Sequence, residues 1–352
     1  MRVHSYITCF AAAVWGVATA DQAPMILHDE KTGSSNKELA GIGFSLSDGY
    51  GVASAFFSNG TSVDVAKIQG GFHFEQYMSM TGGLEELPQT PRAPNCTLPQ
   101  IFCDHWPGTT PTQTKSPLYP MLSALKTATE AALEEPLSVV QVSFPRYPST
   151  PNNHDVLNEE LKLALSQASL QTWRPALYNN EYAAKAHGLF GKCADGYDAP
   201  SANVKNDPPR IILTAEHTRE SLTVVLQIEE CGVYEPIRQS YSRHLGQDAL
   251  DKCRASSPTE SCNSELYESF SHMVRLPIHD ADMIFNGIDA VIIFGESAED
   301  RTMNEMLRKA LIDNHHGVGI TTPPGATGSD PTFIAALGVA QYDWDMKNRY
   351  GH

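Results

Sequence analysis

Side chains that could take part in chemistry stand at the ends of three short apolar runs in this 352-residue chain. These places are residues 45–49, 214–221 and 295–297. Asp48 could hold a metal ion, Arg219 could contact a phosphate group, and Ser297 could act as a nucleophile. Asp48 and Arg219 could instead be ordinary turn residues.

The apolar runs around these places are predicted to be strands. Residues 41–60 form a hairpin pattern, in which two apolar runs flank Ser47-Asp48-Gly49 and a second turn follows at Asn59-Gly60. Further strands are predicted at residues 62–68, 137–144, 210–214, 222–228 and 289–294, and helices at 120–134, 156–170, 180–189, 241–252, 264–274, 300–312 and 333–344. Strands followed by helices, twice over, predict an α/β fold.

Several short motifs occur in the order that one known family has. They lie at residues 41–57, 139–147, 180–189, 244–251, 290–297 and 330–340. Two of them read His244-Leu-Gly-Gln-Asp-Ala-Leu-Asp251 and Asp330-Pro-Thr-Phe-Ile-Ala-Ala-Leu-Gly-Val-Ala340. Together they resemble the nucleotide-binding domain of the seventy-kilodalton heat-shock chaperones, which belong to the actin-like ATPase superfamily. The resemblance implies a two-lobed actin-like fold, which is a duplicated ribonuclease-H-like α/β fold.

The resemblance also divides the chain into parts. It implies a first lobe at residues 41–192, with a Pro-rich insertion at 84–118, and a second lobe at 208–352. The final helix of the second lobe would return toward the first lobe. The interval from Phe57 to Val139 is short for a chaperone, so we expect a trimmed outer subdomain in the first lobe.

The same resemblance assigns a nucleotide cleft to two phosphate loops and an adenosine loop. The residues at these positions are Ser45, Ser47, Asp48, Gly49, Thr214, His217, Thr218, Arg219, Gly295, Glu296 and Ser297.

The residues in these loops depart from what phosphoryl transfer needs. Mg²⁺ is organised by a carboxylate from each phosphate loop of the family, where this chain has Ser45 and Thr214. The second loop contains no Gly, and its Glu216 and Glu220 would repel a phosphate, while Glu296 replaces a Gly of the adenosine loop. We therefore expect a pseudo-ATPase that acts as a binding module, needs no cofactor and has at most residual affinity for ATP. The alternative within the family is an active ATP-binding, chaperone-like ATPase with rearranged metal ligands.

A hydrolase is a further alternative. Residues 291–298 resemble the nucleophile elbow of secreted carboxylesterases, with Ser297 as the nucleophile. Glu299 stands where that turn needs a second Gly, and only 55 residues follow Ser297. The acids and histidines among them are Asp313, Asp330, His315, His316 and His352. His279, Asp280 and Asp282, or His315 and His316, could also ligate a metal or be solvated loop residues.

The beginning of the chain has the pattern of a secretory signal peptide. Arg2 and His4 precede an apolar run at residues 7–17, and Ala18-Thr19-Ala20 fits the small-x-small cleavage rule. We expect residues 1–20 to be removed, a polar segment at 21–40, and a secreted, extracellular protein. No other segment has the roughly 18 consecutive apolar residues of a membrane span.

The cysteine pattern agrees with export. Cys9 lies in the predicted signal, which leaves Cys96, Cys103, Cys193, Cys231, Cys253 and Cys262. Proximity suggests Cys96–Cys103, Cys253–Cys262 and Cys193–Cys231, although six cysteines allow 15 pairings and free thiols are an alternative. Asn59 and Asn95 begin glycosylation sequons.

The charge balance narrows the range of partners. The chain has 25 Lys and Arg against 41 Asp and Glu, for a net charge of −16. Such a chain repels nucleic acid and anionic membranes. The expected partner is therefore a protein, a peptide or a small-molecule ligand, which the sequence does not identify.

Overall fold

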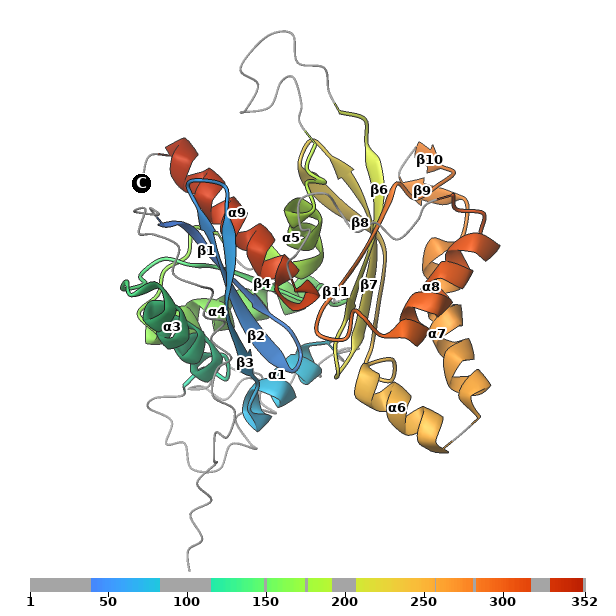
Figure 1. Cartoon of the computed structure of the whole chain (residues 1–352), viewed down its shortest axis with the longest axis horizontal. Coiled ribbons are helices and arrows are strands. Elements are labelled where there is room, and N and C mark those ends of the chain that lie inside the picture. Colours follow the sequence, from blue (N-terminus) through green and yellow to red (C-terminus); the bar gives the residue numbers. More distant parts are fainter. Residues whose placement is uncertain are drawn as a thin grey trace, which may run out of the picture.

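The computed structural model describes residues 39–82, 115–148, 151–174, 177–191, 207–256, 258–280, 283–317 and 330–350. We call residues 39–191 the N-terminal half and residues 207–350 the C-terminal half. Each half contributes one main mixed sheet, so the predicted α/β class is confirmed (Figure 1). The predicted signal peptide, Cys96, Cys103, Cys193 and Asn95 lie outside the described residues.

The first sheet has five strands in the order β3-β2-β1-β4-β5. They are β1 (Leu39–Leu46), β2 (Tyr50–Phe57), β3 (Ser62–Gln69), β4 (Gln141–Phe144) and β5 (Leu177–Tyr178). The first three strands form an antiparallel meander, while β4 runs parallel to β1 and β5 parallel to β4. Residues 41–46 of the central strand β1 are all buried, as expected for a strand that is covered by helices on both sides.

The second sheet repeats this arrangement with four strands in the order β11-β6-β7-β8. They are β6 (Arg210–His217), β7 (Leu222–Glu230), β8 (Val233–Ser242) and β11 (Ala290–Phe294). Strands β6, β7 and β8 form an antiparallel meander, and β11 runs parallel to β6. The order β3-β2-β1-β4 in the first sheet therefore matches β8-β7-β6-β11 in the second, in both sequence order and strand direction.

Helices cover both faces of each sheet (Figure 1). The helices are α1 (Phe72–Gly82), α3 (Tyr119–Leu133), α4 (Pro151–Gln167), α5 (Asn179–Ala186), α6 (Gln247–Ser256), α7 (Thr259–Val274), α8 (Arg301–Asp313) and α9 (Ile334–Tyr350), and a 3-10 turn at Pro331–Phe333 precedes α9. Helices α3 and α4 pack on the outer face of the first sheet, and α7 and α8 on the outer face of the second. Helices α5 and α9 lie between the two sheets.

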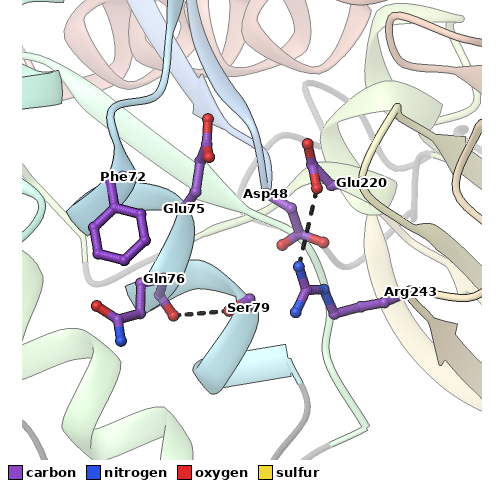
Figure 2. A pocket seen from close by; sticks show the side chains of 7 residues that line it. All are labelled: Asp48, Phe72, Glu75, Gln76, Ser79, Glu220 and Arg243. Carbon is purple, nitrogen blue, oxygen red and sulfur yellow. Dashed lines mark hydrogen bonds and ion pairs between the residues drawn. The ribbon is translucent and has the colours of Figure 1, made fainter. Parts of the chain in front are cut away.

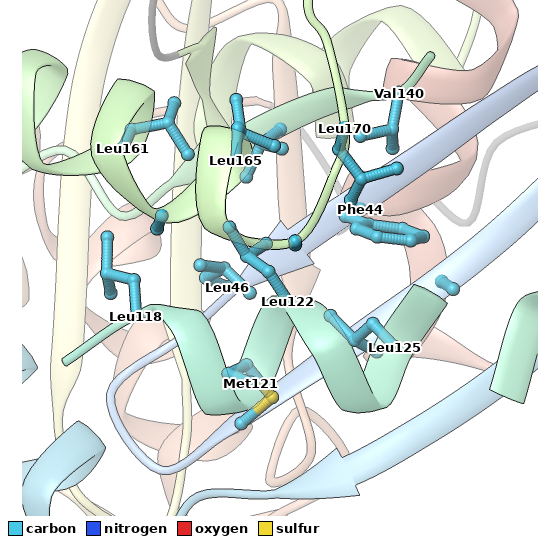
Figure 3. Packing of buried hydrophobic residues seen from close by; sticks show 14 of the residues in the cluster. Phe44, Leu46, Leu118, Met121, Leu122, Leu125, Val140, Leu161, Leu165 and Leu170 are labelled. Atoms are coloured by element: carbon cyan, nitrogen blue, oxygen red, sulfur yellow. The ribbon is translucent and has the colours of Figure 1, made fainter. Parts of the chain in front are cut away.

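The core on the outer face of the first sheet is built from aliphatic side chains on helical spacing. Leu118, Leu122 and Leu125 of the α3 region meet Phe44 and Leu46 of β1, and all five are fully buried (Figure 3). Burying such a side chain stabilises the fold by about 1.5–3 kcal/mol. This core fixes β1 and therefore the position of the turn that follows it.

Glycines let α9 approach the first sheet and α5 closely. A Cβ atom added at Gly43 of β1 would overlap the backbone of α9, and one added at Gly338 of α9 would overlap the Tyr182 carbonyl of α5. The buried Asp343 of α9 accepts hydrogen bonds from the Ile42 amide, at 3.0 Å, and from the Trp173 indole, at 3.1 Å. The last described helix is thus attached to the first described strand.

Some predicted elements differ from the structure. Residues 241–252 are not one helix, because Tyr241 belongs to the edge strand β8 and α6 begins at Gln247. The sequence pattern also missed α1 and a small hairpin of β9 (Ile278–Asp280) and β10 (Met283–Phe285). Edge strands and exposed short elements bury few side chains, so their hydrophobic periodicity is weak.

The expected pairing of Cys253 with Cys262 is confirmed by a disulfide between α6 and α7. Cys231 is also disulfide-bonded. Asn59 lies exposed in the turn between β2 and β3. In the part of the chain that the structure describes, no helix combines the length and hydropathy needed to cross a bilayer.

Candidate functional site

The three segments that could carry chemistry meet at the interface between the two halves. The first follows β1, the second ends β6 and forms the turn to β7, and the third follows β11. Because β6 and β11 are parallel neighbours, their carboxyl ends lie together at one edge of the second sheet. The turn after β1 faces this edge, as the contacts of Ser47 and Asp48 show.

Glu216 of β6 reaches from the C-terminal half into the N-terminal half. Its Oε1 accepts hydrogen bonds from Ser47 Oγ, at 2.5 Å, and from Asn179 Nδ2, at 3.0 Å. The residue is only 4% exposed. Burial raises the pKa of Glu216 from 4.5 to about 8; the nearby charge of Asp48 adds to this rise, and the bonds from Ser47 and Asn179 partly offset it. Glu216 is therefore mainly a neutral carboxylic acid at pH 7.

Asp48 makes the opposite contact, from the N-terminal half toward the C-terminal half. Its Oδ2 accepts hydrogen bonds from Tyr241 OH, at 2.9 Å, and from Ser221 Oγ, while Oδ1 accepts one from Tyr147 OH at 2.6 Å. Burial raises the pKa of Asp48 above its usual value, and the three hydroxyl donors oppose this effect. The rings of Tyr147 and Tyr241 also meet edge to face, with centroids 5.1 Å apart.

Each half thus directs one carboxyl group toward polar groups of the other half. Asp48 also accepts a hydrogen bond from Tyr147 of its own half. We call this set of side chains the inter-half network; its members are Ser47, Asp48, Tyr147, Asn179, Glu216, Ser221 and Tyr241.

The backbone N–H groups of the turn after β6 are already bonded within the chain. Thr218 Oγ1 accepts from the amides of Glu220, at 3.2 Å, and Ser221, at 3.0 Å. The Thr218 amide donates to the Ser221 carbonyl at 2.9 Å, and the Arg219 amide donates to Glu296 Oε1 at 3.3 Å. In its observed conformation this turn has no cradle of free donors for an anion.

Glu296 connects the halves a second time. Its Oε2 lies 2.8 Å from Lys67 Nζ of β3, and its side chain is 8% exposed. The Lys67 ammonium also lies over the Tyr50 ring, 4.8 Å from the centroid. The Glu296 carboxylate therefore bonds the Arg219 amide of its own half and Lys67 of the other half.

Gly295 and His217 determine the shape of the third segment. Gly295 has a φ of 99°, and a Cβ atom there would overlap the His217 carbonyl. The Ser297 amide donates to the His217 carbonyl at 3.0 Å, and His217 Nδ1 lies 2.9 Å from the Ser297 carbonyl oxygen. Burial lowers the pKa of His217. The imidazole is thus bound to the Ser297 backbone rather than to its hydroxyl.

The remaining candidate residues have structural contacts. Ser45 Oγ donates to Asn179 Oδ1 at 2.9 Å, and Thr214 Oγ1 donates to the Val225 carbonyl at 3.2 Å. The Gly49 carbonyl accepts the Gly70 amide at 2.7 Å. Arg219 forms an exposed ion pair with Asp248 at 2.9 Å.

Several partners in this interface were not predicted from the sequence as site residues, namely Tyr147, Asn179, Ser221, Tyr241 and Lys67. Tyr147 and Asn179 lie in or beside motifs that carry the family resemblance, but nothing in those motifs indicated a contact with a carboxyl group.

A pocket of about 240 Å³ opens at the edge of the interface, beside Asp48. Figure 2 shows side chains of α1 on one side and Glu220 and Arg243 on the other. Arg243 lies 3.9 Å from Glu220, and burial together with the Glu220 charge raises the pKa of Glu75. The lining residues are Asp48, Phe72, Glu75, Gln76, Ser79, Glu220 and Arg243.

The described candidate metal ligands His279, Asp280, His315 and His316 lie outside this interface. Among the described residues, no group of three or more His, Cys, Asp and Glu side chains is placed to hold a metal ion. His316 is buried, with Nε2 2.6 Å from the Val274 carbonyl oxygen, and Asp282 lies outside the described residues.

Neither a model of a known family nor a curated protein sequence matches this chain.

Proposed function

We propose that this protein is a degenerate actin-like ATPase domain, related to that of the seventy-kilodalton heat-shock chaperones, which acts as a secreted binding module without hydrolysing ATP. The repeated order of β3-β2-β1-β4 and β8-β7-β6-β11 supports the duplicated fold, because a duplicated ribonuclease-H-like domain has this repeat. The position of α9, which ends the chain yet packs on the first sheet, supports it as well.

The hydrogen bond between Ser47 and Glu216 carries the proposal. In the family, the two phosphate loops stand apart and the nucleotide phosphates lie between them. Here the corresponding loops bond directly, with 2.5 Å between Ser47 Oγ and Glu216 Oε1. A Glu side chain therefore occupies space that a Gly would leave open, and it would repel a phosphate group if it ionised.

The residues present do not fit Mg-ATP. The amides of the turn after β6 are bonded to Thr218, Ser221 and Glu296. Ser45 and Thr214, at the positions of the family's Mg²⁺-organising carboxylates, are buried and bonded to Asn179 and to the backbone of Val225. We derive no phosphoryl-transfer step from this arrangement.

The pocket beside Asp48 is the place in the described structure where a ligand of such a binding module would enter. It lies between α1 of the N-terminal half and the turns of the C-terminal half, so a bound molecule would contact both. Its mixture of carboxyl groups, one Arg and the exposed Phe72 suits a polar peptide or small molecule better than a purely apolar one.

Calorimetry with Mg-ATP tests this proposal. We expect wild-type protein to bind it with a Kd no tighter than about 1 mM, which corresponds to roughly 4 kcal/mol. The matched variant combines Ser45→Asp, Glu216→Gly and His217→Gly, and should bind more tightly than wild type if side chains block the site. Micromolar binding by the wild type that disappears with EDTA would instead support an active ATPase with other metal ligands.

The hydrolase alternative has its own test. Ser297 is not among the described residues with a positive φ, whereas the nucleophile of such an elbow sits on a strained turn. We therefore expect no turnover of simple esters above background. Ester turnover that Ser297→Ala abolishes would favour the hydrolase.

A further inference from the structure

The two carboxyl groups of the inter-half network are buried, and among the described residues neither forms an ion pair with a cation. Within the described part of the chain, Glu216 is bonded only to Ser47 and Asn179, and Asp48 only to the hydroxyls of Tyr147, Ser221 and Tyr241. Arg243 is the cation that influences Asp48, and its guanidinium group lies 3.9 Å from Glu220.

Such a pair resists ionisation while the halves are closed. An ionised carboxylate without a cation loses hydration on burial, and two of them in one interface repel each other. If the halves separate, water reaches both groups and each ionises near its usual pKa. The closed arrangement therefore binds protons more tightly than an open one.

We infer that closure of the two halves is coupled to proton uptake by Asp48 and Glu216, so that rising pH opens the interface between them. This rests on the proposed function only in treating that interface as the binding site. Opening would widen the pocket beside Asp48 and free the Ser47 side chain. The protein would then expose its binding surface in neutral to alkaline solution and cover it in acid.

Other charged and titratable groups around Asp48 and Glu216 do not change the direction of this pH dependence. Those that face it from the surrounding elements are Tyr50 on β2, Glu75 on α1, Tyr147 after β4, Glu220 in the turn after β6, and Tyr241 and Arg243 at the end of β8. Burial raises the pKa of each of the three tyrosines, so they stay neutral. Arg243 favours ionised Asp48, but its pairing with Glu220 offsets part of that charge.

The pH range follows from Glu216, whose pKa rises from 4.5 to about 8 in the closed form. Below pH 4.5 both forms hold the proton on Glu216, and its contribution to closure is complete. Between pH 4.5 and 8 the ratio of closed to open molecules should fall by up to tenfold per pH unit for each proton taken up on closing. Above pH 8 the contribution of Glu216 is lost.

A distance measurement between the halves of the full chain tests the coupling. Spin labels carried on non-natural amino acids at the exposed Thr127 of α3 and Arg308 of α8 leave the cysteines unchanged. In wild type we expect one short distance at pH 5 and a growing population of longer distances toward pH 9. Circular dichroism at each pH verifies that the protein stays folded.

Two variants and a control distinguish opening that depends on proton release from opening that results only from a weaker interface. Glu216→Gln keeps an acceptor oxygen for Ser47 and Asn179 without the titrating proton, so it should stay closed to higher pH, and Asp48→Asn should act in the same direction. Glu296→Gln removes the Lys67 ion pair and should favour opening at every pH, while the logarithm of the closed-to-open ratio keeps its wild-type slope.

An unchanged distance distribution in wild type from pH 5 to pH 9 would overturn the inference. So would a pH response that persists unaltered when Glu216→Gln and Asp48→Asn are combined. These results are independent of the Mg-ATP titration. If the distances respond to pH but Mg-ATP binds tightly, the coupling stands and the pseudo-ATPase proposal fails.

Discussion

Glu216→Gln should change how the free energy of unfolding depends on pH. The folded protein holds a proton on Glu216 that the unfolded chain releases near pH 4.5, because burial raises the folded-state pKa to about 8. Stability from this group is therefore complete below pH 4.5 and is lost as the pH rises to 8. Gln has no proton to lose, so the variant should lack this part of the dependence.

The structure sets an upper limit for the effect. The pKa of Glu216 rises from 4.5 to about 8, and each pKa unit corresponds to about 1.36 kcal/mol, so wild type should lose at most about 5 kcal/mol over this range. Local opening of the interface would lower that figure. Asp48 contributes in the same direction and remains in the variant. Glu216→Gln should thus be close to wild type at pH 5 and more stable than wild type at pH 8.

Urea denaturation at 25 °C, repeated at each pH from 5 to 8, measures both curves. A suitable control is Glu230→Gln, which alters an exposed carboxyl group at the end of β7, away from the network. The control should keep the pH dependence of wild type. The reasoning would be refuted if wild type and Glu216→Gln lost stability in parallel between pH 5 and pH 8.

Two further predictions concern α9. Asp343→Ala leaves the buried Ile42 amide without its acceptor and also removes the bond from the exposed Trp173 indole and the Lys347 ion pair, so urea denaturation should show a loss of about 1–3 kcal/mol, whereas a loss below about 0.5 kcal/mol would contradict this assignment. Gly338→Ala places a methyl group against the carbonyl of Tyr182 and should cost at least about 1–3 kcal/mol, visible as a lower melting temperature. Its control is Gly287→Ala, since a methyl group there meets nothing within 4 Å, and equal melting temperatures for the two variants would contradict the packing argument.

The fold was predictable from the sequence where apolar patterns are strong and local. Residues 41–60 contain two apolar runs with a turn between them, and β1 and β2 follow these runs closely. Strand β8 was not predicted, because most of this edge strand is exposed or half-buried and Tyr241 lies beside the start of a helical pattern. Helix α1 buries only Phe74, Tyr77 and Met78, and its amphipathic signal is correspondingly weak.

The site was only partly predictable. Glu216 was expected to act as a negative charge that repels phosphate, because a sequence gives the residue type without its degree of burial. Its raised pKa follows from burial in an interface with distant parts of the chain, where its partners Ser47 and Asn179 are 169 and 37 positions away. Asp48 and Tyr241 are 193 positions apart, and no periodic pattern in a single sequence relates them.

If the proposed relationship to the actin-like ATPases holds, the network also implies that a single substitution should not create a nucleotide site at this interface. Ser45 is 2% exposed and bonded to Asn179, which also donates to Glu216, so Ser45→Asp would place a third carboxyl group beside a pair that already resists ionisation. That Asp would take up a proton rather than bind Mg²⁺. Only after Glu216 is removed could the loops separate and the new carboxylate meet water and metal. The order in which substitutions act is therefore fixed by the interface: contact between the halves has to be broken before any phosphate contact can form.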